Sequence, residues 1–369
     1  MQRLIENLRL DGHAMRYGQF VPRLYNYCLS LGFRRERMMP SRAFCSDESQ
    51  GYPVILIAQH FGTFPFDHGL IGGNVALDRH GPHAHHGEDL VIIQASHVGY
   101  DADTRRFGVY QRQRTDSHEF GDNCGKLCAV LQWYQFEYRH ACEHILCGRL
   151  GGEPAILIGN QFLDEDRPEG LFLNLDLLID RRAGLLKTLS TSNVFRAAPA
   201  LVERLPADTW GDKPRIIGRD LTADLFFFRR APTERPQGHD LLEAALSPAM
   251  PALVTSRHPP LDAARYHTQV EFDRTYRSIR REPAYREKNL LFISGINIDI
   301  SPRGGLPFPL TKFVPWAAYV RLRDGRSFHL EQDELTDSLR RQSTDNPERT
   351  PFDHAIHDIG DVDDVTIET

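Results

Sequence analysis

Short apolar runs bounded by polar or charged residues are the strongest pattern in this chain. The run Leu90–Ile93 follows an acidic pair and leads through small residues to His97 and then to a Val-Gly turn. Runs this short and rich in Val and Ile are typical of parallel strands buried on both faces. The same reasoning predicts further strands at residues 53–58, 155–158 and 289–299, and a hairpin over residues 316–330 around Asp324-Gly325.

Two segments instead carry apolar residues at helical spacing. Residues 20–33 predict a helix that ends at Gly32, and residues 124–150 predict a long amphipathic helix that ends at Gly151-Gly152. Strands of this kind interleaved with helices indicate an α/β fold with a largely parallel central sheet. Proline-containing breaks at residues 232–236 and 259–260 suggest a main domain over residues 1–250. We expect residues 251–369 to form a β-rich C-terminal extension of unknown function, with a mixed α+β character.

Composition excludes several classes of function. The chain has 369 residues, 25% of them charged, with a net charge of −6, and its short arginine clusters form no basic stripe. We therefore expect no nucleic-acid partner. The N-terminus is too polar for a signal peptide, and no apolar run approaches the ~20 residues of a membrane span. With six cysteines and no export signal, we expect a cytoplasmic protein with reduced thiols, and no membrane partner.

Three residues form a candidate metal site: Cys45, His97 and Cys124. Thiolate and imidazole are ligands that zinc prefers, and three protein ligands with an open fourth position are the pattern of catalytic zinc. Cys45 precedes one predicted strand, His97 ends another, and Cys124 begins a predicted helix, where the helix dipole favours a thiolate. Other catalytic motifs, such as HExxH, a P-loop, GxGxxG and GxSxG, are absent.

Two further features have more than one interpretation. Asp47, two residues after Cys45, is a surface loop residue, an acceptor for a zinc-bound water, or an intermittent fourth ligand. The loop His80–Gly87 contains four histidines, and it is either a second metal site or simply a flexible loop.

Three short motifs in order carry a resemblance to a known family. SRAFCSDES, SHVGYD and NCGKL, with a helix ending in GF before the first, resemble the limiting-CO2-inducible protein B (LCIB) family, which is related to the theta-class carbonic anhydrases. The resemblance covers roughly residues 15–160 of the 1–250 domain. It implies a β-carbonic-anhydrase-like fold with helices flanking the sheet, a homodimer, and zinc held by Cys45, His97 and Cys124.

The resemblance also implies an Asp–Arg dyad whose acid is Asp47. The chain departs from the pattern here, because Ser46 and Ser49 stand where arginine is expected. The dyad arginine would then come from elsewhere, with Arg112 the first candidate and Arg42 the second.

The leading hypothesis from these motifs is reversible hydration of CO2 to bicarbonate by zinc-bound hydroxide, with Asp47 orienting the hydroxide. We expect a small apolar pocket, with His60 passing protons to buffer. Its expected residues are His60, Phe61, Phe64, Phe66, Gly99 and Gly125. Two alternatives remain: a zinc-stabilised binding or assembly protein with weak or no catalysis, and a zinc hydrolase of another small electrophile.

Overall fold

The computed structural model describes residues 2–76, 89–111, 119–230, 240–302 and 308–360. The chain divides into two compact units. We name the first the eight-stranded unit, Arg3–Lys126 with Ala264–Thr369, after its main sheet. The second, the five-stranded unit, consists of Met1–Gln2 with Leu127–Ala263.

A mixed sheet forms the core of the eight-stranded unit. Its strand order is β1-β16-β15-β4-β2-β3, with β17 paired to β16 and β5 paired to β4. Three consecutive pairs, from the β3 edge to the centre, are parallel (β3 with β2, β2 with β4, and β4 with β15), whereas β16 runs antiparallel to β15. The strands are β1 (Met15–Arg16), β2 (Met38–Ala43), β3 (Phe66–Asp67), β4 (Asp89–Asp101), β5 (Arg106–Phe107), β15 (Leu290–Ile300), β16 (Lys312–Arg321) and β17 (Ser327–Leu330).

Strand β4 is the predicted buried parallel strand. Every residue of β4 except Tyr100 is buried, because β2 and β15 cover its edges and helices cover both faces. The strand continues four residues past His97 to Asp101, so His97 lies within the strand and not at its end.

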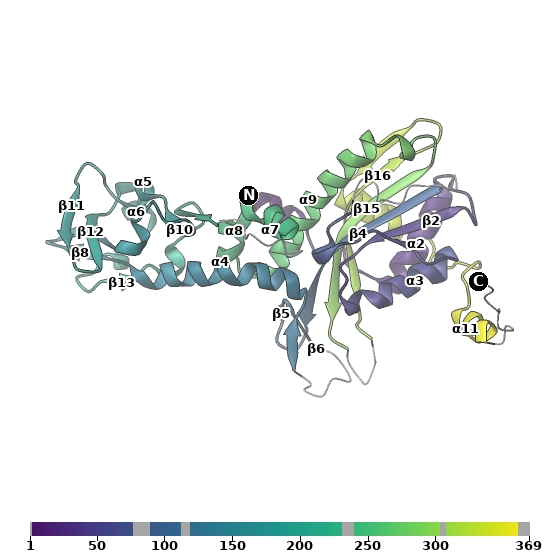
Figure 1. Ribbon diagram of the computed structural model, residues 1–369, viewed down its shortest axis with the longest axis horizontal. Coiled ribbons are helices and arrows are strands. Elements are labelled where there is room, and N and C mark those ends of the chain that lie inside the picture. The colour runs from purple at the N-terminus through teal and green to yellow at the C-terminus, as the bar shows by residue number, and fades with distance from the viewer. Residues whose placement is uncertain (1, 77–88, 112–118, 231–239, 303–307, 361–369) are drawn as a thin grey trace, which may run out of the picture. The chain divides into compact units, whose positions relative to one another are not determined.

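Alternate residues of β4 enter two apolar cores. Val91 and Ile93 pack with Leu24 of α2 (Tyr17–Ser30) and Ile57 of α3 (Gly51–Phe61). On the other face, Leu90 and Ile92 pack with Ile279 of α9 (Pro259–Arg281). Helices therefore flank the sheet on both sides, as expected for this fold class (Figure 1). The other helices of this unit are α10 (Gln332–Arg340) and α11 (Phe352–Gly360), and α1 (Gln2–Asn7) crosses its N-terminal boundary.

The apolar run at residues 53–58 forms helix α3, so the predicted strand there is wrong. Pro53 lies in the first turn, where a helix tolerates proline, and Gly62 ends the helix in the left-handed conformation with φ +72°. Buried Ile57, Ala58 and Phe61 follow helical spacing, whereas Ile55 is exposed. A short apolar run fits a buried strand and a buried helix equally well, and here the end signals decided.

The C-terminal segment contributes to the central sheet. Strand β15 pairs in parallel with β4 over Leu290–Ile300, and β16 and β17 form the predicted hairpin at Asp324-Gly325. The two compact units divide the chain at residues 126/127 and 263/264. The pairing of β15 with β4 could not be read from a local pattern, because a parallel partner strand can lie far away in sequence.

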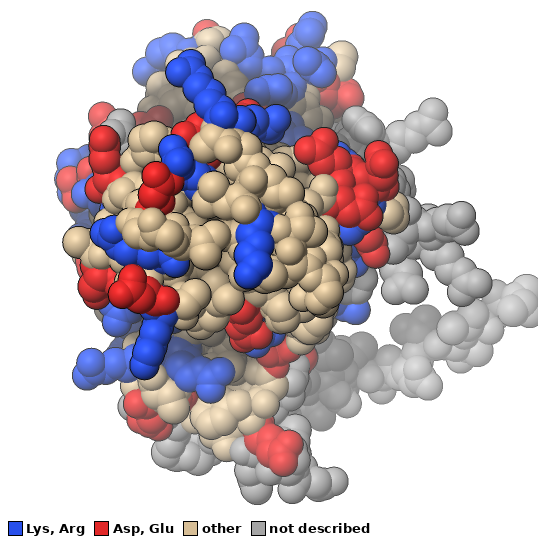
Figure 2. All heavy atoms as spheres, turned by 90° about the vertical axis from the view of Figure 1, so that its left-hand side faces the viewer, with Lys and Arg blue, Asp and Glu red and all other residues tan. Residues whose placement is uncertain are grey.

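The five-stranded unit begins within α4 (Gly125–His144), which ends earlier than predicted because β8 starts at Ile145. Its larger sheet has the order β11-β12-β9-β8-β13, and β10 pairs with β14. Figure 2 shows one end of this unit, where acidic and basic side chains are interspersed among uncharged residues. Its other elements are β8 (Ile145–Leu150), β9 (Glu153–Gly159), β10 (Gly170–Leu173), α5 (Leu175–Leu178), β11 (Leu185–Thr188), β12 (Ser192–Arg196), α6 (Pro199–Arg204), β13 (Arg215–Ile216), β14 (Phe226–Arg229), α7 (Asp240–Leu246) and α8 (Met250–Thr255).

A buried histidine makes the stability of the eight-stranded unit depend on pH. His68 is 4% exposed, its Nδ1 lies 2.6 Å from Ser41 Oγ, and burial lowers its pKa to about 4. Below pH 6.5 the imidazole of His68 binds a proton in the unfolded chain but not in the folded chain. The free energy of unfolding therefore falls as the pH falls from 6.5 toward 4. We expect a loss of about 2 kcal/mol between pH 7 and pH 5 from this group.

Urea denaturation at both pH values measures this loss. We expect His68→Gln to lose less stability than the unsubstituted protein between pH 7 and pH 5. His354→Gln, at an exposed position in α11, is the control and should retain the full loss. An unchanged pH dependence in His68→Gln would contradict the assignment.

Candidate metal centre

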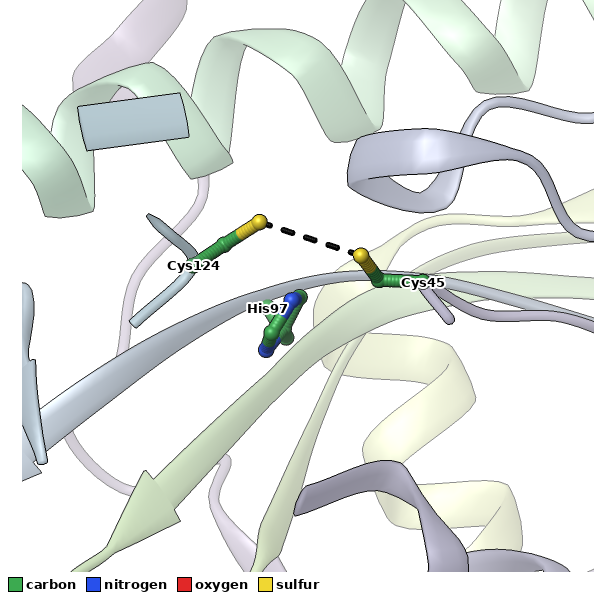
Figure 3. A group of neighbouring side chains, drawn as sticks. All are labelled: Cys45, His97 and Cys124. Carbon is green, nitrogen blue, oxygen red and sulfur yellow. Dashed lines mark hydrogen bonds between the residues drawn. The ribbon is translucent and has the colours of Figure 1, made fainter. Parts of the chain in front are cut away.

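The structure brings Cys45, His97 and Cys124 together. Their Sγ and imidazole nitrogen atoms all lie within 4.8 Å of one another, and all three side chains are buried (Figure 3). Cys45 follows the end of β2, His97 lies in β4, and Cys124 immediately precedes α4. Because β2 and β4 are parallel neighbours, the chain leaving β2 passes beside the far half of β4. This is the edge at which open α/β sheets place their ligands.

The two thiols share a proton. Their sulfur atoms lie 3.8 Å apart, and the hydrogen bond from Cys124 lowers the pKa of Cys45 to about 3. The same bond raises the pKa of Cys124 well above its usual value. The backbone N–H of Gly72 also donates to Cys45 Sγ over 3.3 Å. Cys45 is thus held as a thiolate, the form that binds metals.

The imidazole of His97 presents one nitrogen to the thiols and the other to a carboxylate. Nδ1 lies 2.9 Å from Asp299 Oδ2. Nε2 is buried without a hydrogen-bond partner in the described part of the chain. An unpartnered imidazole nitrogen beside two cysteine sulfurs fits a zinc ion, and a carboxylate behind the histidine is the usual support of such a ligand. The residues present therefore fit the metal that the motifs predicted.

Asp299 was not among the sequence-predicted site residues. It is fully buried near the end of β15 and accepts hydrogen bonds on Oδ2 from Ser49 Oγ and Gln50 Nε2, both over 2.8 Å. Thr311 Oγ1 donates to Oδ1 over 3.1 Å. The available signal was an acidic residue in the otherwise apolar run of residues 289–299, since a buried charge needs partners.

Helix α9 holds the loop that donates to Cys45. His267 lies 2.8 Å from Ser96 Oγ through Nδ1 and 3.0 Å from Asn74 Oδ1 through Nε2. Glu271 accepts from the backbone N–H of Val75 over 2.8 Å. These bonds fix residues 72–75 against the sheet, beside the sulfur of Cys45.

Asp47 lies at the start of the short 3-10 helix η1 (Glu48–Gln50), where its Oδ1 accepts from Ser49 N over 3.1 Å. Burial raises the pKa of its carboxyl group, although the positive charge of His97 opposes this shift. Arg42, a candidate dyad partner, instead donates to Asp67 Oδ2 over 2.6 Å. Arg112, the other candidate, and the histidines of residues 80–86 lie outside the described residues.

Four of the expected pocket residues have partners other than the three ligands: His60, Phe61, Phe64 and Phe66. Helix α3 starts beside Gln50, and a rise of 1.5 Å per residue puts His60 about 14 Å along it. His60 is buried beside Asn346, whose Nδ2 lies 3.2 Å from its Nδ1. Phe61 packs on Tyr25, exposed Phe64 stacks on Phe352, and Phe66 is exposed.

The two expected glycines have different surroundings. Gly99 N donates to Asn123 O over 2.8 Å, and a Cβ on Gly99 would lie 2.5 Å from Val109 O. This glycine therefore lets the segment before Cys124 pack against β4. Gly125 begins α4 and has open space around its Cα.

Comparisons with known proteins identify the fold. No protein-family profile matches the chain, and no curated protein matches it by sequence. Among solved structures, the chain is similar to PtLCIB4, described as a homolog of the limiting CO2-inducible protein LCIB, at 12% identity. The match has a TM-score of 0.53 and covers 87% of this chain and 95% of that one.

A mutant of PtLCIB4 matches with a TM-score of 0.51 at 12% identity, over 86% of this chain and 93% of the mutant. The chain has the LCIB fold. The β-carbonic-anhydrase-like α/β class expected from the sequence is thereby confirmed, with a mixed sheet whose centre is parallel. In the described part of this LCIB fold, no helix has the length and apolar character needed to cross a membrane.

Proposed function

We propose that this protein is a zinc-dependent carbonic anhydrase that catalyses the reversible hydration of CO2 to bicarbonate. The observation that carries the proposal is the buried convergence of Cys45, His97 and Cys124, in which Nε2 of His97 has no hydrogen-bond partner in the described part of the chain. The LCIB fold supports it, since that fold is carbonic-anhydrase-like. The proposal includes CO2 and bicarbonate as the small-molecule partners and a cytoplasmic homodimer, whose subunit number light scattering tests.

Three protein ligands leave one of the four tetrahedral positions of zinc open to solvent or substrate. Zinc bound there would lower the pKa of a coordinated water to about 7 and so supply a hydroxide nucleophile at neutral pH. The chain's own residues provide the ligands and the buried surroundings of the ion. Cys45 Sγ, Cys124 Sγ and the Nε2 lone pair of His97 would hold the ion, and all three of these side chains are buried.

Asp47 is the residue that we propose accepts a hydrogen bond from the attacking nucleophile. It lies two residues beyond Cys45 and is half-buried. Its Oδ1 accepts a hydrogen bond from Ser49 N, which fixes the carboxyl group at the start of η1, where we propose that it orients the nucleophile.

Stopped-flow CO2 hydration at pH 7 and pH 8.5 tests this role. We expect zinc-loaded protein to turn over, and Asp47→Ala to lose about 100-fold in rate while it retains its zinc. Asp353→Ala, at an exposed position in α11, is the matched control and should keep the full rate. Equal rates in Asp47→Ala and the control would remove Asp47 from the mechanism.

One observation favours a second candidate, a zinc-stabilised assembly protein of the same fold with little or no turnover. The side chain of Arg42 is paired with Asp67 and not with Asp47. Stoichiometric zinc without turnover at either pH would support this candidate against the carbonic anhydrase.

A further inference from the structure

We propose that Asp299 is a positioning residue that fixes the tautomer of His97, so that Nδ1 keeps its proton and Nε2 offers its lone pair to the metal. This inference rests on the proposed zinc site. A neutral imidazole has one N–H and one lone pair, and the partner of one nitrogen decides the role of the other. Only the tautomer protonated at Nδ1 can bind a metal through Nε2.

The geometry around Asp299 leaves its carboxylate as an acceptor of four side-chain donors. Oδ2 lies 2.9 Å from His97 Nδ1 and 2.8 Å from both Ser49 Oγ and Gln50 Nε2. Oδ1 lies 3.1 Å from Thr311 Oγ1. Ser49, Gln50, His97 and Asp299 are all 1% exposed or less, so water does not compete for these bonds.

The amide of Gln50 must turn its nitrogen toward this carboxylate. The opposite orientation would place two acceptor oxygens 2.8 Å apart. Gln50 Oε1 then accepts from Asn297 Nδ2 over 2.6 Å, and Asn297 Oδ1 accepts from Tyr17 OH over 2.7 Å. The run of donors from the tyrosine hydroxyl thus ends at the carboxylate of Asp299. Gln50 Nε2 also lies 3.3 Å from His97 Nδ1, but Asp299 Oδ2 is nearer, at 2.9 Å, and is the acceptor for the Nδ1 proton.

The register of β15 against β4 places Asp299 within reach of the His97 imidazole. Asn297 is the parallel partner of His97 and Asp299 that of Gly99, and residues 97, 297 and 299 lie on the same face of the sheet. Asp299 and His97 are 202 residues apart in sequence, yet the rigid centre of the sheet holds them in contact. A ligand supported by a neighbouring strand keeps its ring orientation before the metal arrives.

Asp299→Asn tests the inference, because asparagine keeps the shape but adds an N–H donor at this position. The neutral amide is a weaker acceptor for the Nδ1 proton than the carboxylate, even where Ser49 and Gln50 hold its oxygen toward His97, and an amide nitrogen facing Nδ1 would favour the wrong tautomer, with the proton on Nε2. We expect zinc affinity, measured by competition with a chromogenic chelator, to fall about 10- to 100-fold. Asp89→Asn is the matched control, since Asp89 is also fully buried but begins β4, eight residues before His97, and accepts from Asn289 Nδ2. It should bind zinc as tightly as the unsubstituted protein.

Nitrogen-15 NMR of the histidine side chains adds a readout that does not require the variant to fold. In the zinc-loaded unsubstituted protein we expect His97 to carry its proton on Nδ1, in a hydrogen bond. A proton on Nε2, or zinc affinity in Asp299→Asn equal to that of the Asp89→Asn control, would overturn the inference. Absence of zinc binding in the unsubstituted protein would instead overturn the proposed function.

Discussion

Cys45→Ser, His97→Ala and Cys124→Ser are each expected to abolish stoichiometric zinc binding and CO2 hydration. The three ligand atoms lie within 4.8 Å in a buried site, and the loss of any one leaves two protein ligands for an ion that prefers four. We expect the zinc content of each variant to fall from one ion per chain to less than about a tenth. Hydration should fall to the uncatalysed rate, because no nucleophile is generated at neutral pH without the metal.

Cys28→Ala is the matched control for the ligand substitutions. Cys28 is a fully buried thiol in α2 that belongs to the apolar core and not to the three-ligand group. It should retain both zinc and activity, even if it loses some stability. Elemental analysis together with stopped-flow hydration measures both properties. Full zinc content in all three ligand variants would contradict the assignment of these residues as zinc ligands.

Gly73→Ala is expected to cause a large loss of stability beside the site. Gly73 has φ +83°, and a Cβ there would lie 2.4 Å from the backbone oxygen of Ala95 in β4. A buried strand does not move to relieve that contact, so the loop must shift away from the sheet. We expect the free energy of unfolding to fall by about 3 kcal/mol. The N–H of Gly72 should also move from Cys45 Sγ, which would weaken zinc binding.

Gly62→Ala separates the steric contact from the backbone conformation. Gly62 has φ +72°, but the nearest atom to its Cβ position is Thr350 Oγ1 at 3.9 Å. Only the left-handed conformation is penalised there, so we expect a loss of about 1 kcal/mol and unchanged zinc affinity. Urea denaturation of the two variants gives both values. Equal losses would show that the contact with Ala95 is relieved without cost.

Local patterns predicted an element correctly wherever the spacing of apolar residues matched either a helix or a strand, but not both. Helix α2, strand β4 and the hairpin at Asp324-Gly325 agree with the prediction, because their apolar spacing and end signals lie within a few residues of each other. Helix α3 shows the limit. Its run of apolar residues has no period that separates a strand from a helix, and the end signals, Pro53 in the first turn and Gly62 after the last, decided the outcome.

The candidate ligands were predictable for a chemical reason. Cys45, His97 and Cys124 are residue types that zinc prefers, and each lies next to or within an element whose buried character is visible in sequence. Three short motifs around them sufficed to suggest the LCIB fold, although overall identity to the solved LCIB-like structure is 12%. Ligand chemistry constrains a few residues strongly, whereas the rest of the core needs only apolar side chains of suitable volume.

The sequence by itself therefore determined the α/β class, the buried strand that carries His97, and the three candidate ligands. Only the tertiary structure decided which groups surround them. It paired His60 with Asn346 and Arg42 with Asp67, and it brought Asp299 to His97. The physical reason is that a buried polar side chain takes its hydrogen-bond partners from whichever strand lies beside it. That neighbour is set by the parallel register of β4 and β15, whose residues are about 200 positions apart in the chain.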